Sequence, residues 1–170
     1  AGAMPFHTWI PDAAIDAPVT FMAYMPAAFE KLLGIYLLAR ICLDIFTLQP
    51  GSGLSLLLMI IGAATIVLAV MMALVQKDLK RLLSYHAVSQ VGYMILGIGT
   101  AIPIGIAGGI FHMINHAMYK SGLFLSAGSV EHRAGTTDLR NLGGLAREMP
   151  ITAAGFTVCA LAISGVWPLN

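Results

Sequence analysis

The chain has 170 residues, of which 58% are hydrophobic and only 10% are charged, and its mean hydropathy is +0.85. Because soluble domains carry about 25% charged residues, this composition argues against a water-soluble fold. The net charge of +1 offers no basic surface for nucleic acid. Cys42 and Cys159 stand alone, without the paired spacing of a disulfide framework, an iron–sulfur cluster or a haem attachment site.

Apolar segments follow one another along the chain, and about 20 apolar residues are enough to cross a bilayer. The first is predicted to begin after Pro18, whose missing amide hydrogen would be unpaired at a helix start anyway. The stretch from Leu82 to Tyr119 has no Asp, Glu, Lys or Arg, but it is too long for one crossing, and Pro103 divides it. The sequence therefore predicts an all-α, polytopic transmembrane helical bundle. Its predicted spans, about five, cover residues 19–43, 54–75, 82–100, 104–127 and 150–167, and residues 129–148 are predicted to form a polar loop.

Basic residues gather in the loops on one side of this predicted bundle. Each span carries the chain to the opposite side, so the loop after the second span and the loop after the fourth share a side. By the positive-inside rule, that side faces the cytoplasm. It holds Lys77, Lys80, Arg81, Arg133, Arg140 and Arg147, whereas the other side has only Arg40.

Lys31 falls midway along the first predicted span. An ionised lysine at that depth costs about 2.5 to 3.5 kcal/mol to insert, so it usually has a function. The alternative, a side chain that snorkels to the surface, requires a climb of about 15 Å, which exceeds the length of the lysine stem. Glu30 lies about 100° around the helix and is interpreted either as the partner of a base on another helix or as a silent, protonated acid. Pro26, one turn earlier, is expected to kink the span or to admit water.

The fourth predicted span carries His112, His116 and Lys120 at successive turns, which places them about 6 Å apart on one helical face. With Asn115 and Tyr119 beside them, this stripe can hold a file of water molecules, and histidine changes its charge near physiological pH. A proton wire is the interpretation that accounts for the whole stripe. The alternative, histidines satisfied by packing against polar neighbours, explains one such residue more easily than a series.

A metal site is the competing interpretation for two histidines one turn apart. The segment HMINH has Met113 where a zinc-protease helix has its glutamate, and two haem ligands on one helix would lie on the same side of the iron. We therefore predict no metal and no cofactor site. Lys80 is interpreted either as a topological anchor or as part of an ion pathway, and His86 as an accessory residue one turn into the third span. Close helix packing is predicted at Gly105, Gly108 and Gly109.

Four segments of the chain resemble a known family. They are PFHTWIPDA at residues 5–13, QKDLKRLLSYHAVSQVGYM at 76–94, FHMINHAMYKSGLF at 111–124 and NLGGLAREMP at 141–150. The family is that of the antiporter-like subunits of respiratory complex I, membrane-bound nickel–iron hydrogenases, formate hydrogenlyases and multisubunit sodium/proton antiporters. The segments occur in the family order and cover essentially the whole chain.

The resemblance implies a fold and a set of functional residues. Members of this family contain two inverted repeats of helices that form proton half-channels joined by a line of charged residues. This chain would hold the last helix of the first repeat, with Lys31 as its central lysine, and much of the second repeat. Lys80 would lie near the cytoplasmic mouth of the second repeat. Its polar axis would be formed by His112, His116 and Lys120.

Two further charged residues of the family pattern would fall outside this chain, one just before its start and one just after its end. We therefore expect it to be a piece of a longer protein that does not translocate protons by itself. An apolar start without Met or a charged region also argues against a signal peptide.

The resemblance implies a proton-translocating or sodium-translocating membrane subunit of a redox-driven complex, with no flavin, cluster or catalytic site of its own. The alternative is a subunit of a multisubunit sodium/proton antiporter without redox partners, and a third hypothesis is a cofactor-binding, cytochrome-like bundle. The expected partners are the lipid bilayer, other membrane subunits, protons and sodium ions, but not nucleic acid. The expected location is the cytoplasmic membrane of a bacterium or archaeon rather than the mitochondrial inner membrane.

Overall fold

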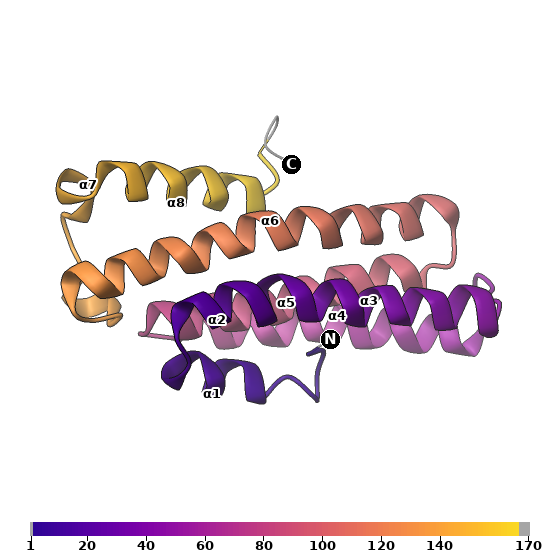
Figure 1. Cartoon of the computed structure of the whole chain (residues 1–170). Helices are drawn as coiled ribbons and strands as arrows, with labels where there is room; N and C mark the ends of the chain where they lie inside the picture. Colours follow the sequence, from indigo (N-terminus) through magenta and orange to yellow (C-terminus); the bar gives the residue numbers. More distant parts are fainter. Residues whose placement is uncertain (1, 167–170) are drawn as a thin grey trace.

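The computed structural model describes residues 2–166, and these residues form helices joined by short connections (Figure 1). The predicted all-α fold is therefore confirmed for this part of the chain. In chain order the elements are α1 (Trp9–Asp16), α2 (Val19–Tyr24), the π-helical turn η1 (Met25–Phe29), α3 (Glu30–Arg40), the π-helical turn η2 (Ile41–Ile45), α4 (Gly53–Leu74), α5 (Leu79–Gly99), α6 (Pro103–Ala134), the 3-10 turn η3 (Leu139–Asn141), α7 (Leu145–Glu148) and α8 (Pro150–Ile163).

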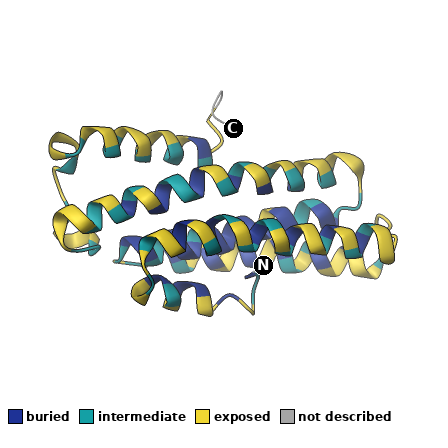
Figure 2. Ribbon diagram, in the orientation of Figure 1, coloured by how far each residue is buried: buried dark blue, intermediate teal, exposed yellow. Residues whose placement is uncertain are grey.

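Helix α6 lies at the centre of the packing. It contacts α5, α8, α2, η1 and α3, while α4 packs along α5 and α1 packs on α5 from outside. Figure 1 shows α8 on one side of α6 and the remaining long helices on the other. Buried residues follow the inner faces of α5 and α6 (Figure 2). A side chain on the inner face of α6 is therefore covered by helices from both halves of the chain.

The observed helix bounds correct several predictions. The first predicted span is a continuous helical stretch from Val19 to Ile45 that contains two π-helical turns. Helix α6 extends to Ala134, so the predicted loop over 129–148 begins only at Gly135, whose positive φ of 69° ends the helix. Exposed polar residues at the end of α6 resembled a loop in sequence, but a helix that emerges from an apolar layer also carries such residues. Helix α1 was not predicted, because it is short, and the last predicted residue of the final span, Trp167, lies outside the described residues.

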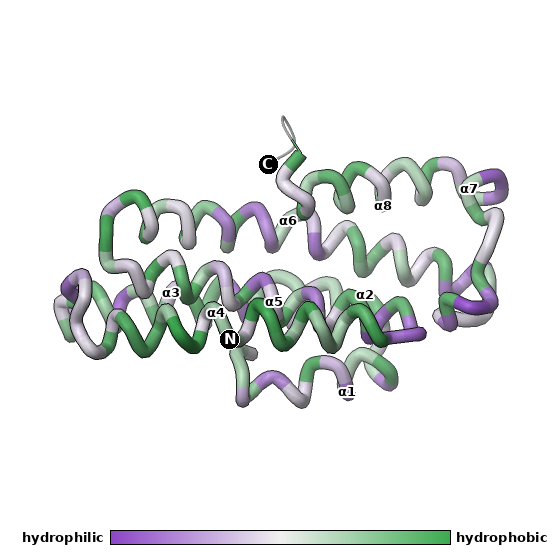
Figure 3. The backbone as a smooth tube through the Cα atoms, turned by 180° about the vertical axis from the view of Figure 1, so that it is seen from behind, coloured by the Kyte–Doolittle hydropathy of each residue, from purple (hydrophilic) through white to green (hydrophobic). Residues whose placement is uncertain are grey.

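Within the described residues, α4 is the helix whose length and composition suffice to cross a membrane, and α8 is a shorter apolar helix. Figure 3 shows α4 as hydrophobic along most of its length. Its outer face leaves large apolar side chains uncovered, such as Ile60, which is 65% exposed, and Met71, which is 61% exposed. Helix α5 has 21 residues and α6 has 32, but both carry polar residues, and these are the residues of the candidate site.

Two loops that are distant in sequence meet at one end of the bundle. The amide of Leu79 donates to the carbonyl oxygen of Thr137 at 2.9 Å. The amide of Leu139 donates to the carbonyl oxygen of Lys77 at 2.8 Å. The side chain of Asp78 begins α5 by accepting from the Arg81 amide at 2.9 Å, and it also accepts from the Thr137 hydroxyl. The loop after α4 and the loop after α6 therefore share one end of the bundle, as the count of crossings predicted.

Arg140 lowers the pKa of Asp138 to about 2 in the second of these loops. The cause is hydrogen bonding, because Arg140 Nε donates to Oδ1 at 3.0 Å and Nη2 donates to Oδ2 at 2.5 Å. An unfolded aspartate titrates near pH 3.9, so the stability from this exposed pair is present above about pH 4 and is lost as the pH falls toward about 2.

We expect a small part of the acid sensitivity of the protein to disappear in Asp138→Asn, since the amide cannot titrate. The measurement compares the thermal stability of the solubilised protein at about pH 5 and about pH 3, a range within which the pair is progressively lost. An Asp138→Asn variant that loses as much stability on acidification as the parent would contradict this expectation.

Candidate functional site

Lys31 on α3 is completely buried, with 0% of its surface exposed. Its Nζ donates a hydrogen bond to the carbonyl oxygen of Pro26 and lies 3.5 Å from Glu30 Oε2. The π-helical turn explains the first contact. The Glu30 amide donates to the Met25 carbonyl, five residues back, so the Pro26 carbonyl lacks the amide it would pair with in an α-helix. The predicted disturbance at Pro26 thus takes the form of a wide turn that supplies an acceptor to a buried lysine.

The position of Glu30 differs from the expectation. Glu30 was interpreted as the partner of a base on another helix or as a silent acid, about 100° around the helix from Lys31, whereas the two neighbours form an ion pair. Both side chains are long enough to bend toward each other across the angle that separates their backbones. The Glu30 side chain is 14% exposed, so the pair lies at the edge of the buried region.

The stripe predicted on α6 crosses the centre of the bundle. His116 and Lys120 are 0% exposed, and Tyr119 is 6% exposed, whereas His112 is half-buried. The His116 ring lies 5.5 Å from that of Tyr119 and 6.3 Å from that of His112, between ring centroids. Asn115, the other accessory residue of this stripe, lines a shallow pocket between α6 and α8 together with Tyr119.

Several polar atoms of this stripe have no hydrogen-bond partner among the described residues. They are Lys120 Nζ, both ring nitrogens of His116 and the hydroxyl of Tyr119. Nδ1 of His86 on α5 also has no partner among the described residues. Buried polar groups in proteins are nearly always hydrogen-bonded to protein or to ordered water. A space of about 170 Å³ next to Lys120 has a mostly apolar lining that also includes His86 and Ser164.

The two buried lysines come from different helices that pack together. Lys31 lies on α3 and Lys120 on α6, and these helices are in contact. The charge of Lys31 acts on both His116 and Lys120. His116 and Lys120 lie one helical turn apart on α6, and Lys31 is distant from them in sequence. The three therefore form one electrostatic group at the centre of the fold.

Gln90 is a site residue that the sequence analysis missed. On α5 it is 7% exposed, and its Oε1 lies 2.8 Å from Nε2 of His112. The ring of His112 also meets the edge of Tyr93, with ring centroids 5.9 Å apart. The signal in the sequence was an amide within a predicted membrane span, since burial of an unpaired amide is unfavourable and such a residue usually has a partner.

Lys80 lies apart from the central group, at the end of the bundle where the two loops meet. Its Nζ is 3.1 Å from Glu131 Oε1 and 3.3 Å from the carbonyl oxygen of Ile15. His86 is partly buried and lines the space next to Lys120, so it lies with the central group. Within residues 2–166 no group of three His, Cys, Asp or Glu side chains could hold a metal ion, and Cys42 and Cys159 are free thiols.

These features define a class of protein: a helical membrane bundle with two lysines and a histidine buried at its centre. A family model described as "NADH:quinone oxidoreductase/Mrp antiporter, TM" matches residues 1–170. The chain belongs to this family.

Similar proteins include both redox and antiporter complexes. The chain is 44% identical to F(420)H(2) dehydrogenase subunit L of Methanosarcina mazei, over 97% of this chain and 24% of that protein. Its fold matches a chain of the membrane-bound sulfane sulfur reductase, an archaeal respiratory membrane complex, with a TM-score of 0.88 and 34% identity over 96% of this chain and 34% of the other. It also matches a chain of the Mrp complex from Dietzia sp., with a TM-score of 0.90 and 31% identity over 97% of this chain and 30% of the other. The chain thus spans about a quarter to a third of the length of these relatives.

Proposed function

We propose that this chain is the proton-conducting core of a membrane subunit in a redox-driven complex. The observation that carries the proposal is the complete burial of Lys31, His116 and Lys120 on two helices in contact. Titratable groups inside a membrane protein are costly and usually mark an ion pathway. A core that served only packing would favour apolar side chains, and it would not leave buried polar atoms without protein partners.

The arrangement supports a simple order of transfer. A proton on Lys31 repels one on Lys120, so loading one lysine favours release from the other. His116 lies within the charge field of both, and its two ring nitrogens can accept and donate through water. His112 continues the stripe toward the opposite end of α6, where a space of about 400 Å³ adjoins it. Asn115, Tyr119 and His86 serve as accessory groups, and Lys80 stands at the cytoplasmic mouth.

The proposal includes a membrane arrangement. The helical stretch 19–45 and helices α4, α5, α6 and α8 are the spans, and the end with Lys80 faces the cytoplasm of a bacterium or archaeon. The partners are lipid, further membrane subunits and the remaining part of the longer protein to which the chain belongs. The subunit needs no cofactor, because protonation of its own side chains carries the charge.

Sodium/proton exchange without redox partners is the second candidate function. It is favoured by the match to a chain of the Mrp complex, whose TM-score is as high as that of the respiratory complex. The subunits that copurify with the full-length protein distinguish the two functions. A hydrogenase, dehydrogenase or quinone module supports the first, and a set of antiporter subunits alone supports the second.

We expect His116→Gln in the full-length subunit, within its assembled complex, to lower ion transport by about tenfold or more, because the amide keeps hydrogen-bonding capacity but cannot carry the proton. The measurement is ion uptake into vesicles that contain the purified complex. Normal transport in an assembled His116→Gln complex would remove this histidine from the pathway.

A further inference from the structure

Lys80 has a carboxylate partner that the sequence analysis placed in a loop. Its side chain is only 6% exposed, whereas that of Glu131 is 38% exposed, and the two charged groups are 3.1 Å apart. Glu131 lies on the extension of α6 that continues past the predicted end of the helix. The pair therefore joins a buried base on α5 to an acid that reaches the surface.

The surroundings of Glu131 open toward the outside of the bundle. A groove of about 810 Å³ runs beside Glu131, and the charged or titratable side chains in its lining are Glu131, His132 and Arg133. Glu131 thus has the groove on one side and Lys80 on the other. Such an acid can exchange protons with water in the groove while it remains within hydrogen-bond distance of the lysine.

Two other acids near the start of α5, Asp78 and Asp12, have partners of their own. Asp78 accepts from the Arg81 amide and from the Thr137 hydroxyl. Asp12 lies 3.4 Å from Nη2 of Arg81, in an exposed pair whose guanidinium stays protonated at any physiological pH. Among the described residues, Glu131 is the acid paired with Lys80.

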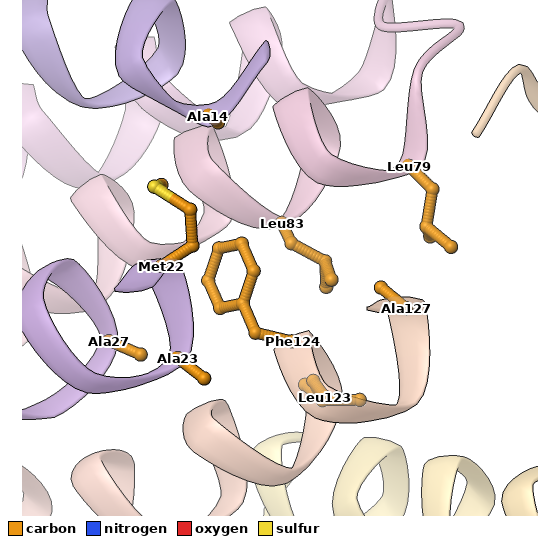
Figure 4. Close-up of a cluster of buried hydrophobic side chains, with 9 residues drawn as sticks. All are labelled: Ala14, Met22, Ala23, Ala27, Leu79, Leu83, Leu123, Phe124 and Ala127. Carbon is orange, nitrogen blue, oxygen red and sulfur yellow. The ribbon is translucent and has the colours of Figure 1, made fainter. Parts of the chain in front are cut away.

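An apolar layer separates this pair from the central group. Leu83 on α5 and Leu123 and Phe124 on α6 belong to a buried cluster, shown in Figure 4, that also includes Leu79 and Ala127 at the Lys80 end. Lys120 Nζ lies 5.8 Å from the centre of the Phe124 ring, so this ring adjoins the central lysine. The pair and the central lysine therefore occupy two polar regions on either side of one apolar layer.

We propose that Glu131 is the cytoplasmic proton-exchange residue of the pathway, an inference that rests on the proposed function. In the forward step the Lys80 ammonium gives a proton to Glu131 Oε1, which leaves a neutral amine and a neutral carboxylic acid. The acid then releases the same proton to water in the groove and becomes a carboxylate again. The amine takes a new proton from the central group when water crosses the apolar layer, and the whole sequence runs in reverse for uptake.

The test compares Glu131→Gln, Glu131→Asp and Glu131→Ala in the full-length subunit within its complex. Glutamine keeps an oxygen that accepts from Lys80 Nζ but cannot carry a proton, whereas aspartate keeps the acid. We expect Glu131→Gln to lower ion uptake into vesicles about as much as Glu131→Ala, by about threefold or more, and Glu131→Asp to retain most of the activity. Glu148→Gln, which changes an exposed glutamate on α7, is the control and should have no effect.

The outcomes separate this inference from the proposed function. If Glu131→Gln transports normally while Glu131→Ala does not, the residue acts only by holding α5 and α6 together, and the inference fails. If Glu131→Gln is normal but His116→Gln is inactive, the central pathway stands and its exit lies elsewhere. If both variants transport normally in assembled complexes, the proposed function fails as well. Subunit levels in the membrane, measured for every variant, show that a loss of transport is not a loss of assembly.

Discussion

Replacing Lys31 with methionine is expected to lower ion transport by about tenfold or more, because the loss of a positioned proton carrier costs on that order or above. Methionine fills a similar elongated space, so the change removes the charge without opening a cavity. The Pro26 carbonyl and the Glu30 carboxylate lose the ammonium that contacts them, and the charge that acts on His116 and Lys120 disappears. Electron transfer in a redox complex should continue with weaker coupling to ion movement.

The measurement follows ion uptake and the redox reaction in the same vesicles. Lys77→Met is the matched control, since Lys77 is an exposed lysine in the loop after α4 and its loss should change neither signal. Removing one partner of a buried ion pair is destabilising, so subunit levels in the membrane are measured beside transport to separate lost coupling from lost assembly. A Lys31→Met complex that couples as well as the parent would show that this lysine is structural, and the proposed relay between the two lysines would be wrong.

Substitution of Gly62 is expected to cause the largest loss of stability. A Cβ atom at Gly62 would lie 2.8 Å from the carbonyl oxygen of Gly92 and 2.8 Å from the amide nitrogen of Leu96. A Cβ at Gly92 would lie 2.7 Å from the carbonyl oxygen of Gly62, so the backbones of α4 and α5 are in direct contact at this point. Backbone atoms cannot move aside as a side-chain tip can. We expect Gly62→Ala to lower the free energy of unfolding by about 1–3 kcal/mol, the usual cost of overpacking.

Gly108→Ala provides the control, because a Cβ at Gly108 meets nothing within 4 Å. Both positions lie inside long helices, so both variants gain the same helix propensity, up to about 1 kcal/mol. The difference between them isolates the effect of close packing, measured by detergent or thermal unfolding of the purified protein. Gly92→Ala should resemble Gly62→Ala, and the double variant should cost less than the sum, since both push apart the same pair of helices. Equal stabilities of Gly62→Ala and Gly108→Ala would contradict the observed contact.

The glycine pattern illustrates how far a sequence can predict packing. Close packing was predicted for Gly105, Gly108 and Gly109. The structure confirms it for Gly105 and Gly109, where a Cβ would come within 2.9 Å of backbone carbonyl oxygens of α5, but Gly108 has open space around it. The contact between Gly62 and Gly92 was not predicted, because a glycine in an apolar span shows only that an approach is permitted. Which helix approaches it depends on the arrangement of the bundle.

Glu30 and Glu131 show the same limit for charged residues. An ideal helix places Glu30 about 100° around from Lys31, but the two long side chains reach each other. Glu131 resembled a loop residue because its neighbours are polar, and its pairing with Lys80 depends on the continuation of α6 past residue 131. The direction in which a long side chain points and the length of a helix both depend on contacts that a local sequence pattern does not contain.

Composition and periodicity by themselves determined much of this protein. Apolar length predicted the long helices, Pro103 the division between two of them, and the repeat of four residues the stripe of His112, His116 and Lys120. Only the tertiary structure decided the partners across helices: Gln90 for His112, Glu131 for Lys80, and Lys31 beside the stripe on α6. The physical reason is that helical periodicity defines which residues share a face of one helix, whereas the face of another helix that meets it is set by packing of the whole bundle.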